Sequence, residues 1–205
     1  MNAVVAFISM PSTRDQMEQP RATTLTATTL EDNTPPLCSP LTCAYHQAPP
    51  RVNYDENPSV FGPILRGELP VLTLKETPLL LGFQDRTPRA PLHALIIPKQ
   101  YIKSVFELNE NDIDLLGDMH DMAMDLIQTY YPEAAKREDY ILCYHVPPFN
   151  SVDHLHLHVL APASEMSWIY RFVKYLVGTR WCAGETDVIQ RLQAGKKAVP
   201  YLFSG

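Results

Sequence analysis

The chain has 205 residues, of which 45% are hydrophobic and 20% are charged, and its formal net charge is −6. This length and composition suit one globular domain with a substantial core. The acidic balance argues against a broad nucleic-acid-binding surface, which needs a basic stripe, but it allows a small nucleotide, which needs only local positive charge or backbone donors.

The sequence also bears on the compartment. No apolar stretch reaches the roughly 18 residues that a membrane span needs, and the apolar start at residues 3–8 lacks the basic flank of a signal peptide. The cysteines form no Cys-x-x-Cys pair and imply no disulfide framework: Cys38, Cys43, Cys143 and Cys182. We therefore expect no membrane partner and a reducing compartment, either the cytoplasm, the nucleus or both.

The first part of the chain differs in composition from the rest. Residues 1–57 are rich in threonine and proline, and such a segment buries too little apolar surface to offset its ordering entropy. We predict a disordered tail over 1–57 and a folded domain over 58–205. The domain is expected to begin with a short helix over 61–66, closed by Gly67. Candidate strands follow over 71–75, 79–84 and 92–97.

The clearest helical pattern covers residues 109–130, where apolar residues recur at helical spacing. Asn109 can cap this helix, Asp112 lies near its positive end, and Pro132 is expected to stop it. Two further strands are predicted over 140–145 and 154–160.

Two helices are then predicted over 168–176 and 187–192, the second capped by Thr186. The first is rich in aromatic residues, and it either packs on the sheet or forms a lid or dimer surface near the site. The order of elements predicts an α+β domain, an antiparallel sheet of about five strands with the long helix packed on it and a C-terminal helical extension.

The most informative feature is the run His154-Leu155-His156-Leu157-His158-Val159-Leu160. Histidines alternate with aliphatic residues, which is the period of a β-strand, so the three imidazoles are expected to share one face. The aliphatic side chains would face the opposite way, into the core.

Two chemistries fit three imidazoles on one face. One is metal binding, because neutral imidazole is a common zinc ligand. The other is metal-free catalysis, with one histidine as nucleophile and its neighbours handling protons and phosphate oxygens. A closed zinc site needs a fourth ligand, and Asp153 would point to the opposite face of a regular strand. The spacing alone leaves both chemistries open.

The run matches the pattern His-φ-His-φ-His-φ-φ, where φ is apolar, and the chain therefore resembles the histidine triad superfamily of nucleotide hydrolases and transferases. The likeness extends upstream to Gly82-Phe83-Gln84-Asp85-Arg86-Thr87-Pro88-Arg89-Ala90-Pro91-Leu92-His93-Ala94-Leu95-Ile96-Ile97-Pro98-Lys99. The segment Tyr144-His145-Val146-Pro147-Pro148-Phe149-Asn150-Ser151-Val152 is similar to the Hint branch of that superfamily. The resemblance covers about residues 58 to 195.

This resemblance implies hydrolysis of an adenylyl bond through a nucleotidyl-histidine intermediate. His156 would attack the α-phosphorus, while the main-chain carbonyl of His154 would hold its other ring nitrogen as a donor. His158 would contact the phosphate and the leaving group and transfer protons. His93 would help to orient the triad, and Ser151 would hydrogen-bond the leaving-group atom.

The same resemblance suggests nucleotide-binding residues. Asp85 matches the acidic residue that accepts hydrogen bonds from the ribose hydroxyls, and Arg86 stands where relatives usually carry an aliphatic residue. Asn150 and Lys99 are candidate phosphate contacts, and His145 is a candidate second proton donor. The expected ligands are AMP and adenylates, and the expected assembly is a homodimer.

One departure from the family pattern concerns zinc. Many relatives begin this domain with Cys-x-x-Cys and carry a histidine after the Pro-Lys pair. Here the matching positions read Ser59-Val60-Phe61-Gly62 and Pro98-Lys99-Gln100-Tyr101. We therefore predict no structural zinc and no cofactor.

The sequence leaves four hypotheses about function. The leading one is an adenosine 5′-monophosphoramidase that releases AMP from P–N linked adenylates. The enzymatic alternatives are hydrolysis of dinucleoside polyphosphates and removal of AMP from adenylylated DNA ends, although the acidic charge argues against a nucleic-acid partner. The last is a nucleotide-binding scaffold with weak turnover.

Overall fold

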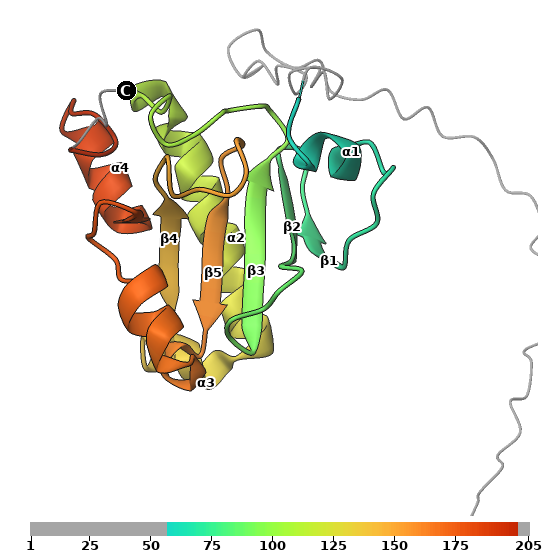
Figure 1. Ribbon diagram of the computed structural model, residues 1–205, viewed down its shortest axis with the longest axis vertical. Helices are drawn as coiled ribbons and strands as arrows, with labels where there is room; N and C mark the ends of the chain where they lie inside the picture. The colour runs from blue at the N-terminus through green and yellow to red at the C-terminus, as the bar shows by residue number, and fades with distance from the viewer. Residues whose placement is uncertain (1–56, 201–205) are drawn as a thin grey trace, which may run out of the picture. The chain divides into compact units, whose positions relative to one another are not determined.

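The computed structural model describes residues 57–200 (Figure 1). The disordered tail predicted over 1–57 lies outside the described residues, except for Asn57, and stays a prediction. Within the described part, no helix combines the length and the apolar character needed to cross a membrane.

The centre of the fold is a six-stranded sheet in the order β1-β2-β3-β5-β4-β6, with antiparallel neighbours throughout. Its strands are β1 (Thr73–Glu76), β2 (Leu80–Gln84), β3 (Leu92–Pro98), β4 (Ile141–His145), β5 (Leu157–Ala161) and β6 (Cys182–Gly184). The predicted α+β class and antiparallel sheet are confirmed. The sixth strand was not expected, because three residues are too few to show a strand period.

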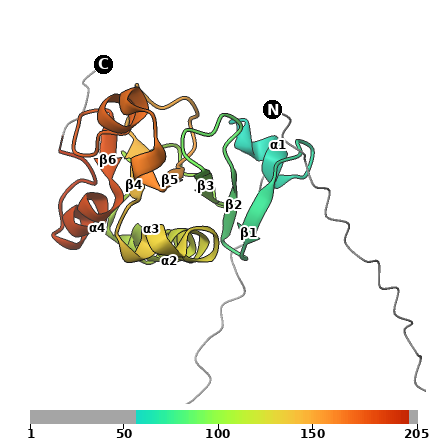
Figure 2. The same cartoon turned by 90° about the horizontal axis from the view of Figure 1, so that it is seen from below.

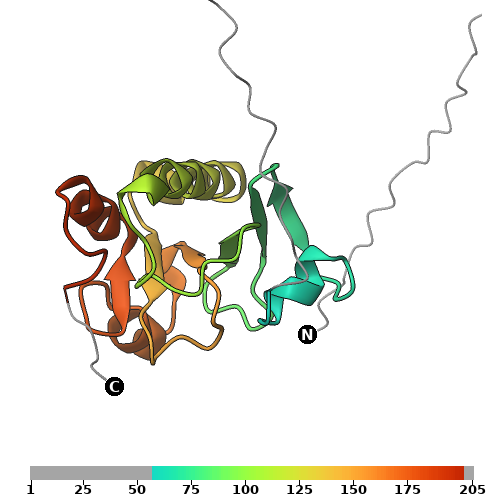
Figure 3. The same cartoon turned by 90° about the horizontal axis from the view of Figure 1, so that it is seen from above.

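The helical elements lie on both faces of the sheet. They are α1 (Phe61–Leu65), η2 (Glu110–Asp112), α2 (Ile113–Tyr130), α3 (Pro132–Lys136), η3 (Ala163–Glu165), η4 (Tyr170–Lys174) and α4 (Glu185–Gln193). Figures 2 and 3 show α2 on one face of the sheet, while α1 and the segment around η4 lie on the other. On the sheet face opposite α2, the surface between α1 and the segment around η4 is therefore available for a site.

The long helix is confirmed, with a different first turn. Asn109 caps a 3₁₀ turn, and its side chain and that of Asp112 satisfy each other's backbone N–H groups. Leu116, Met119 and Ile127 of α2 are buried against the sheet. Pro132 does not only stop the helix: it begins α3, where its missing N–H costs nothing.

Two predicted boundaries were wrong. Strand β5 begins at Leu157 and not at His154, because the main chain before it is bonded outside the ladder. The Leu155 N–H donates to the Ile102 carbonyl, and the His154 carbonyl accepts from the His156 ring. Helix α4 begins at Glu185 after Gly184, so Thr186 is not its cap. The aromatic-rich segment is helical, with a π-helical turn at η4.

Candidate active site

Five histidines gather on the sheet face opposite α2. Strands β3, β4 and β5 carry His93, His145 and His158, and the segment entering β5 carries His154 and His156. All five are buried. The alternation predicted from the sequence is observed, because Leu155, Leu157 and Val159 belong to the core on the α2 side.

His154 is held by protein groups on both ring nitrogens. Asn57 Nδ2 lies 2.7 Å from its Nδ1, and its Nε2 lies 2.9 Å from the Pro98 carbonyl. The amide orientation of Asn57 is fixed, because its Oδ1 accepts from the N–H and hydroxyl of Ser59. Nδ2 therefore donates to His154 Nδ1, and His154 Nε2–H donates to the carbonyl. With both nitrogens used, the His154 ring is not available to a substrate.

His156 is fixed by one hydrogen bond, which leaves its other nitrogen to react. Its Nδ1 lies 2.6 Å from the His154 carbonyl, which can only accept, so Nδ1 carries the proton. Nε2 then presents a lone pair. The ring is also held by the edge-on contact with Phe61, at 5.6 Å between centroids. This is the hydrogen bond that the resemblance implied.

A second chain of hydrogen bonds fixes His158. The Arg89 amide donates to His93 Nδ1 at 3.2 Å, so His93 carries its proton on Nε2. His93 Nε2 lies 3.0 Å from His158 Nδ1 and donates to it. His158 must then carry its proton on Nε2, a buried atom that has no hydrogen-bond partner within residues 57–200. The result is an N–H donor held ready beside the His156 lone pair, with ring centroids 5.0 Å apart.

His145 and the segment around η4 complete the cluster. The His145 ring lies 4.5 Å from that of His158, and its Nε2 is also buried without a partner among the described residues. Tyr175 packs against His93, His145 and His158, with centroids 5.1 to 5.7 Å away. Lys174 lies close enough for its charge to lower the pKa of all three imidazoles.

The cluster is built to stay neutral. Burial lowers the pKa of His93, His145 and His154 to about 4. Burial also lowers the pKa of His156, although the hydrogen bond to the His154 carbonyl opposes this. Burial and the neighbouring imidazoles lower the pKa of His158 well below its ordinary value. At neutral pH the His156 ring is therefore uncharged, as a nucleophile must be.

A pocket of about 760 Å³ opens beside these residues, between α1, the end of β2 and the loop before β5. Its walls are largely apolar and include Phe61, Val71, Phe83 and Leu95. Its polar lining comes from Gln84, Asp85, Arg86, Thr87, Ser151, His156 and His158. The volume lies in the range of small-molecule sites, and the apolar walls suit a purine ring.

The structure brings together some of the predicted binding residues. Asp85, Arg86 and Ser151 line the pocket with His156 and His158. One oxygen of Asp85 accepts from the Thr87 N–H at 2.7 Å, and the other lies 3.7 Å from His93 Nε2. Among the described residues the second oxygen makes no hydrogen bond, so it can accept one from a ligand.

Two predicted phosphate contacts are engaged elsewhere. Lys99 lies outside the pocket lining, with its ammonium 2.6 Å from Glu76 Oε1. Asn150 donates to the Val152 carbonyl and to Asp153, which shapes the loop that presents Ser151. Neither side chain reaches the pocket in this arrangement.

Two sets of side chains could hold a metal ion within the described residues. They are His145 with His156 and His158, and Asp85 with His93 and His158. Both sets need His158. Its Nδ1 lone pair already accepts from His93, and its Nε2 carries the proton, so ligation would require the Arg89–His93–His158 chain to break. The hydrogen bonds of this cluster favour metal-free chemistry over the metal-binding alternative.

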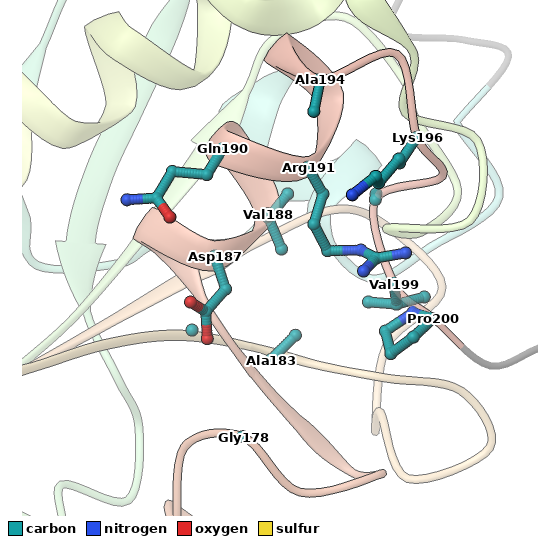
Figure 4. Close-up of a pocket in the computed structure, with 12 residues that line it drawn as sticks. Gly178, Ala183, Asp187, Val188, Gln190, Arg191, Ala194, Lys196, Val199 and Pro200 are labelled. Atoms are coloured by element: carbon teal, nitrogen blue, oxygen red, sulfur yellow. The ribbon is translucent and has the colours of Figure 1, made fainter.

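A second pocket of about 410 Å³ lies between β6, α4 and residues 194–200 (Figure 4). Asp187, Arg191 and Lys196 line it, and Arg191 Nε donates to the Lys197 carbonyl. It contains none of the clustered histidines. The pocket beside His156 is therefore the candidate active site.

Sequence reasoning missed several residues that set the geometry. Asn57 reaches His154 across 97 positions, and neither Asn57 nor the Arg89 amide has a local signal in the sequence. Tyr175 has a weak one, because it belongs to the aromatic-rich segment 168–176 that was predicted to pack on the sheet or lie near the site.

Comparisons with known proteins support one family. The family model described as "Scavenger mRNA decapping enzyme C-term binding" matches residues 58–172. The zebrafish (Danio rerio) protein "Adenosine 5'-monophosphoramidase HINT3" is 37% identical over 114 residues, which are 56% of this chain and 68% of that protein. The Mus musculus protein of the same name is 32% identical over 143 residues, 69% of this chain and 84% of that one.

Another relative carries a different activity in its name. The Arabidopsis thaliana "Bifunctional adenosine 5'-phosphosulfate phosphorylase/adenylylsulfatase HINT4" is 36% identical over 118 residues, 57% of this chain and 77% of that protein. Among solved structures, a HIT family hydrolase from Legionella pneumophila Philadelphia 1 aligns with a TM-score of 0.46 and 35% identity, covering 49% of this chain and 89% of that one. The family-model match over more than half of the chain confirms the resemblance found in the sequence, and the chain belongs to the histidine triad superfamily, with Hint proteins among its relatives.

Proposed function

We propose that this protein is an adenosine 5′-monophosphoramidase, which releases AMP from adenylates with a P–N bond. The names of the HINT3 relatives at 32 to 37% identity support this activity. The observation that carries the proposal is the pairing of His156 and His158. One presents a lone pair and the other an N–H, each fixed by a hydrogen bond on its opposite ring nitrogen.

The proposed reaction has two steps at phosphorus. His156 Nε2 attacks the α-phosphorus and forms a bond to it, while the bond from phosphorus to the amine breaks and the amine leaves with a proton taken from solvent water. The His158 Nε2–H donates a hydrogen bond to a phosphate oxygen or to the leaving nitrogen, with Ser151 beside it. Water then attacks the same phosphorus and gives up a proton to the solvent, and the bond from phosphorus to His156 breaks, which releases AMP and restores His156. Because the imidazole is already neutral, the first step needs no prior loss of a proton.

The pocket supports recognition of an adenylate. Apolar side chains on α1 and β2 offer a slot for the base, and the free oxygen of Asp85 can accept from a ribose hydroxyl. Arg86 adds a positive charge to the rim, where it can favour the phosphate.

Hydrolysis of adenosine 5′-phosphosulfate is a second candidate, favoured by the likeness to HINT4 at 36% identity. Dinucleoside polyphosphates and adenylylated DNA ends share the same adenylyl phosphorus and differ only in the leaving group. Side-by-side turnover on these substrates and on a lysine-linked phosphoramidate ranks the candidates. Binding of AMP without turnover on any of them would support the scaffold alternative.

The decisive experiment measures hydrolysis of a fluorogenic adenosine 5′-phosphoramidate by the wild type and by His156→Ala, with a metal chelator present. Metal-free catalysis predicts full wild-type activity in chelator and a loss of about 10⁴-fold or more in the variant. Wild-type activity that disappears in chelator would instead support a metal on the histidines. A variant that keeps its activity would mean that another residue is the nucleophile.

We further propose a homodimer that acts in the cytoplasm, the nucleus or both, as the resemblance to Hint proteins suggests. Light scattering of the purified full chain gives its mass in solution, and fractionation of cells gives its compartment. A monomer at working concentration would contradict the first of these proposals.

A further inference from the structure

A patch of large apolar side chains is exposed on the segment 168–177, outside the candidate active site. It contains Trp168, Ile169, Phe172, Val173, Leu176 and Val177. Trp168 is 69% exposed, Ile169 56% and Phe172 52%. Phe149, also exposed, packs edge-on against Trp181 at 6.2 Å and extends this apolar patch. Contiguous exposed apolar surface of this kind marks an interaction site in a soluble domain.

The inner side of the same segment is firmly packed, so the exposure is not a consequence of a loose end. Tyr175 is buried against three imidazoles of the site. Trp181 Nε1 donates to the Val173 carbonyl at 2.8 Å, and the Arg89 guanidinium lies 4.2 Å from the centre of the Tyr170 ring. The segment is thus held by one side and presents the apolar patch on the other.

The segment that carries the apolar patch has charges of one sign, and acids lie at its ends: Glu165 precedes it, and the Asp187 carboxylate lies with Val177 beside Gly184. Between Met166 and Gly184 the chain has no aspartate or glutamate but three cations, Arg171, Lys174 and Arg180, although the whole chain carries −6. Arg171 lies over the Phe172 ring at 5.3 Å. A segment of tryptophan, phenylalanine and aliphatic residues whose only charged members are arginine and lysine has the composition of helices that lie in the interface of an anionic membrane.

We propose that the apolar patch and its three cations dock on the surface of an anionic lipid bilayer. The apolar side chains would enter the boundary between headgroups and acyl chains, and the cations would face the lipid phosphates and carboxylates. A second copy of this chain is a poorer occupant, because a two-fold contact through this patch would gather the cations of both copies in one interface. This proposal departs from the sequence-based expectation of no membrane partner, but it needs no membrane-crossing helix, and residues 57–200 contain none.

Flotation of the full chain with vesicles tests the proposal. We expect binding to phosphatidylcholine vesicles that contain phosphatidylserine, and little binding to phosphatidylcholine alone. Trp168→Ser with Phe172→Ser should abolish binding. Arg171→Gln with Lys174→Gln should weaken it by about fivefold for each cation removed, and added salt should weaken wild-type binding in the same way.

Matched control variants lie on the other side of the sheet. Tyr130→Ser removes an exposed aromatic residue from α2, and Lys136→Gln with Arg137→Gln removes two cations near α3. Both should bind vesicles like the wild type. Unchanged circular dichroism and thermal midpoint show that each variant is folded.

Several outcomes would overturn the proposal. They are absence of wild-type binding to anionic vesicles, equal binding to both vesicle types, or binding that survives both patch variants. A wild-type dimer that becomes a monomer in Trp168→Ser with Phe172→Ser would identify a second copy as the occupant. Vesicle binding is measured without turnover, so its result is independent of the proposed phosphoramidase activity.

Discussion

The side chains on the two sides of the run 154–160 are buried in contrasting environments. On the α2 side, Leu155, Leu157 and Val159 are at most 2% exposed and belong to one apolar core. On the other side, the imidazoles are also buried, but nitrogens of His145 and His158 have no partner among the described residues. A buried polar atom without a partner costs free energy, so the imidazole side gives up stability for donors and lone pairs that a substrate can use. Unsatisfied buried polar atoms of this kind are typical of functional sites.

The largest expected effect comes from the imidazole side. His158→Gln removes the fixed Nε2–H beside the His156 lone pair, and turnover should fall by about 10²- to 10⁴-fold. The thermal midpoint should change little, because glutamine can still accept from His93. Steady-state kinetics on the phosphoramidate checks this, with His120→Gln on α2 as the control that keeps its activity. Equal losses in both variants would remove the special role of His158.

A substitution on the α2 side of the run should lower the free energy of unfolding and leave the turnover of the folded protein unchanged. Leu157→Ala leaves a cavity in the core against α2, and the free energy of unfolding should fall by about 2 to 5 kcal/mol. Denaturant unfolding measures this loss. The turnover of the molecules that remain folded should stay near the wild-type value. A variant that is stable but inactive would show that the two sides are coupled.

Lowering the pH should destabilise the folded protein through its buried neutral imidazoles. The pKa values of His93, His145 and His154 are lowered by burial to about 4, from 6.5 in the unfolded chain. The unfolded chain therefore takes up protons first as the pH falls below about 6.5, and stability that is complete above that pH is lost on the way to about pH 4. We expect a loss of about 1 kcal/mol for each of these imidazoles at about pH 5.5. Chemical unfolding at about pH 7.5 and 5.5 measures it, and an unchanged free energy would mean that these imidazoles are not buried in the neutral form.

The same contrast explains what could be read from the sequence. The alternation of His154, His156 and His158 with aliphatic residues is a local period, and so is the helical spacing of α2, and both were predicted. The tautomer of His156 was implied by the resemblance, but those of His154, His93 and His158 were not, because they depend on Asn57 and on the Arg89 amide, which touch the histidines only after folding. Strand β6 and the packing of Tyr175 on the imidazoles are also long-range, and Lys99 reaches Glu76 because β1 and β3 both pair with β2.

Asn57 offers the finest test of how the two sides are linked. Asn57→Ala removes the donor to His154 Nδ1 and leaves a buried acceptor unpaired, so stability should fall by about 1 to 3 kcal/mol. The His154 ring would then be held only through the Pro98 carbonyl, and its own carbonyl, which orients His156, would be less well placed. Turnover should therefore fall as well, by a smaller factor than in His158→Gln.

The matched control for this variant is Asn109→Ala, which breaks the cap before α2 at a similar cost of about 0.5 to 2 kcal/mol but touches no histidine. If both asparagine variants lose stability and only Asn57→Ala loses turnover, the hydrogen bond from Asn57 positions the nucleophile through His154. If both keep full turnover, the orientation of His156 depends on its own strand and on Phe61, and Asn57 serves the fold alone.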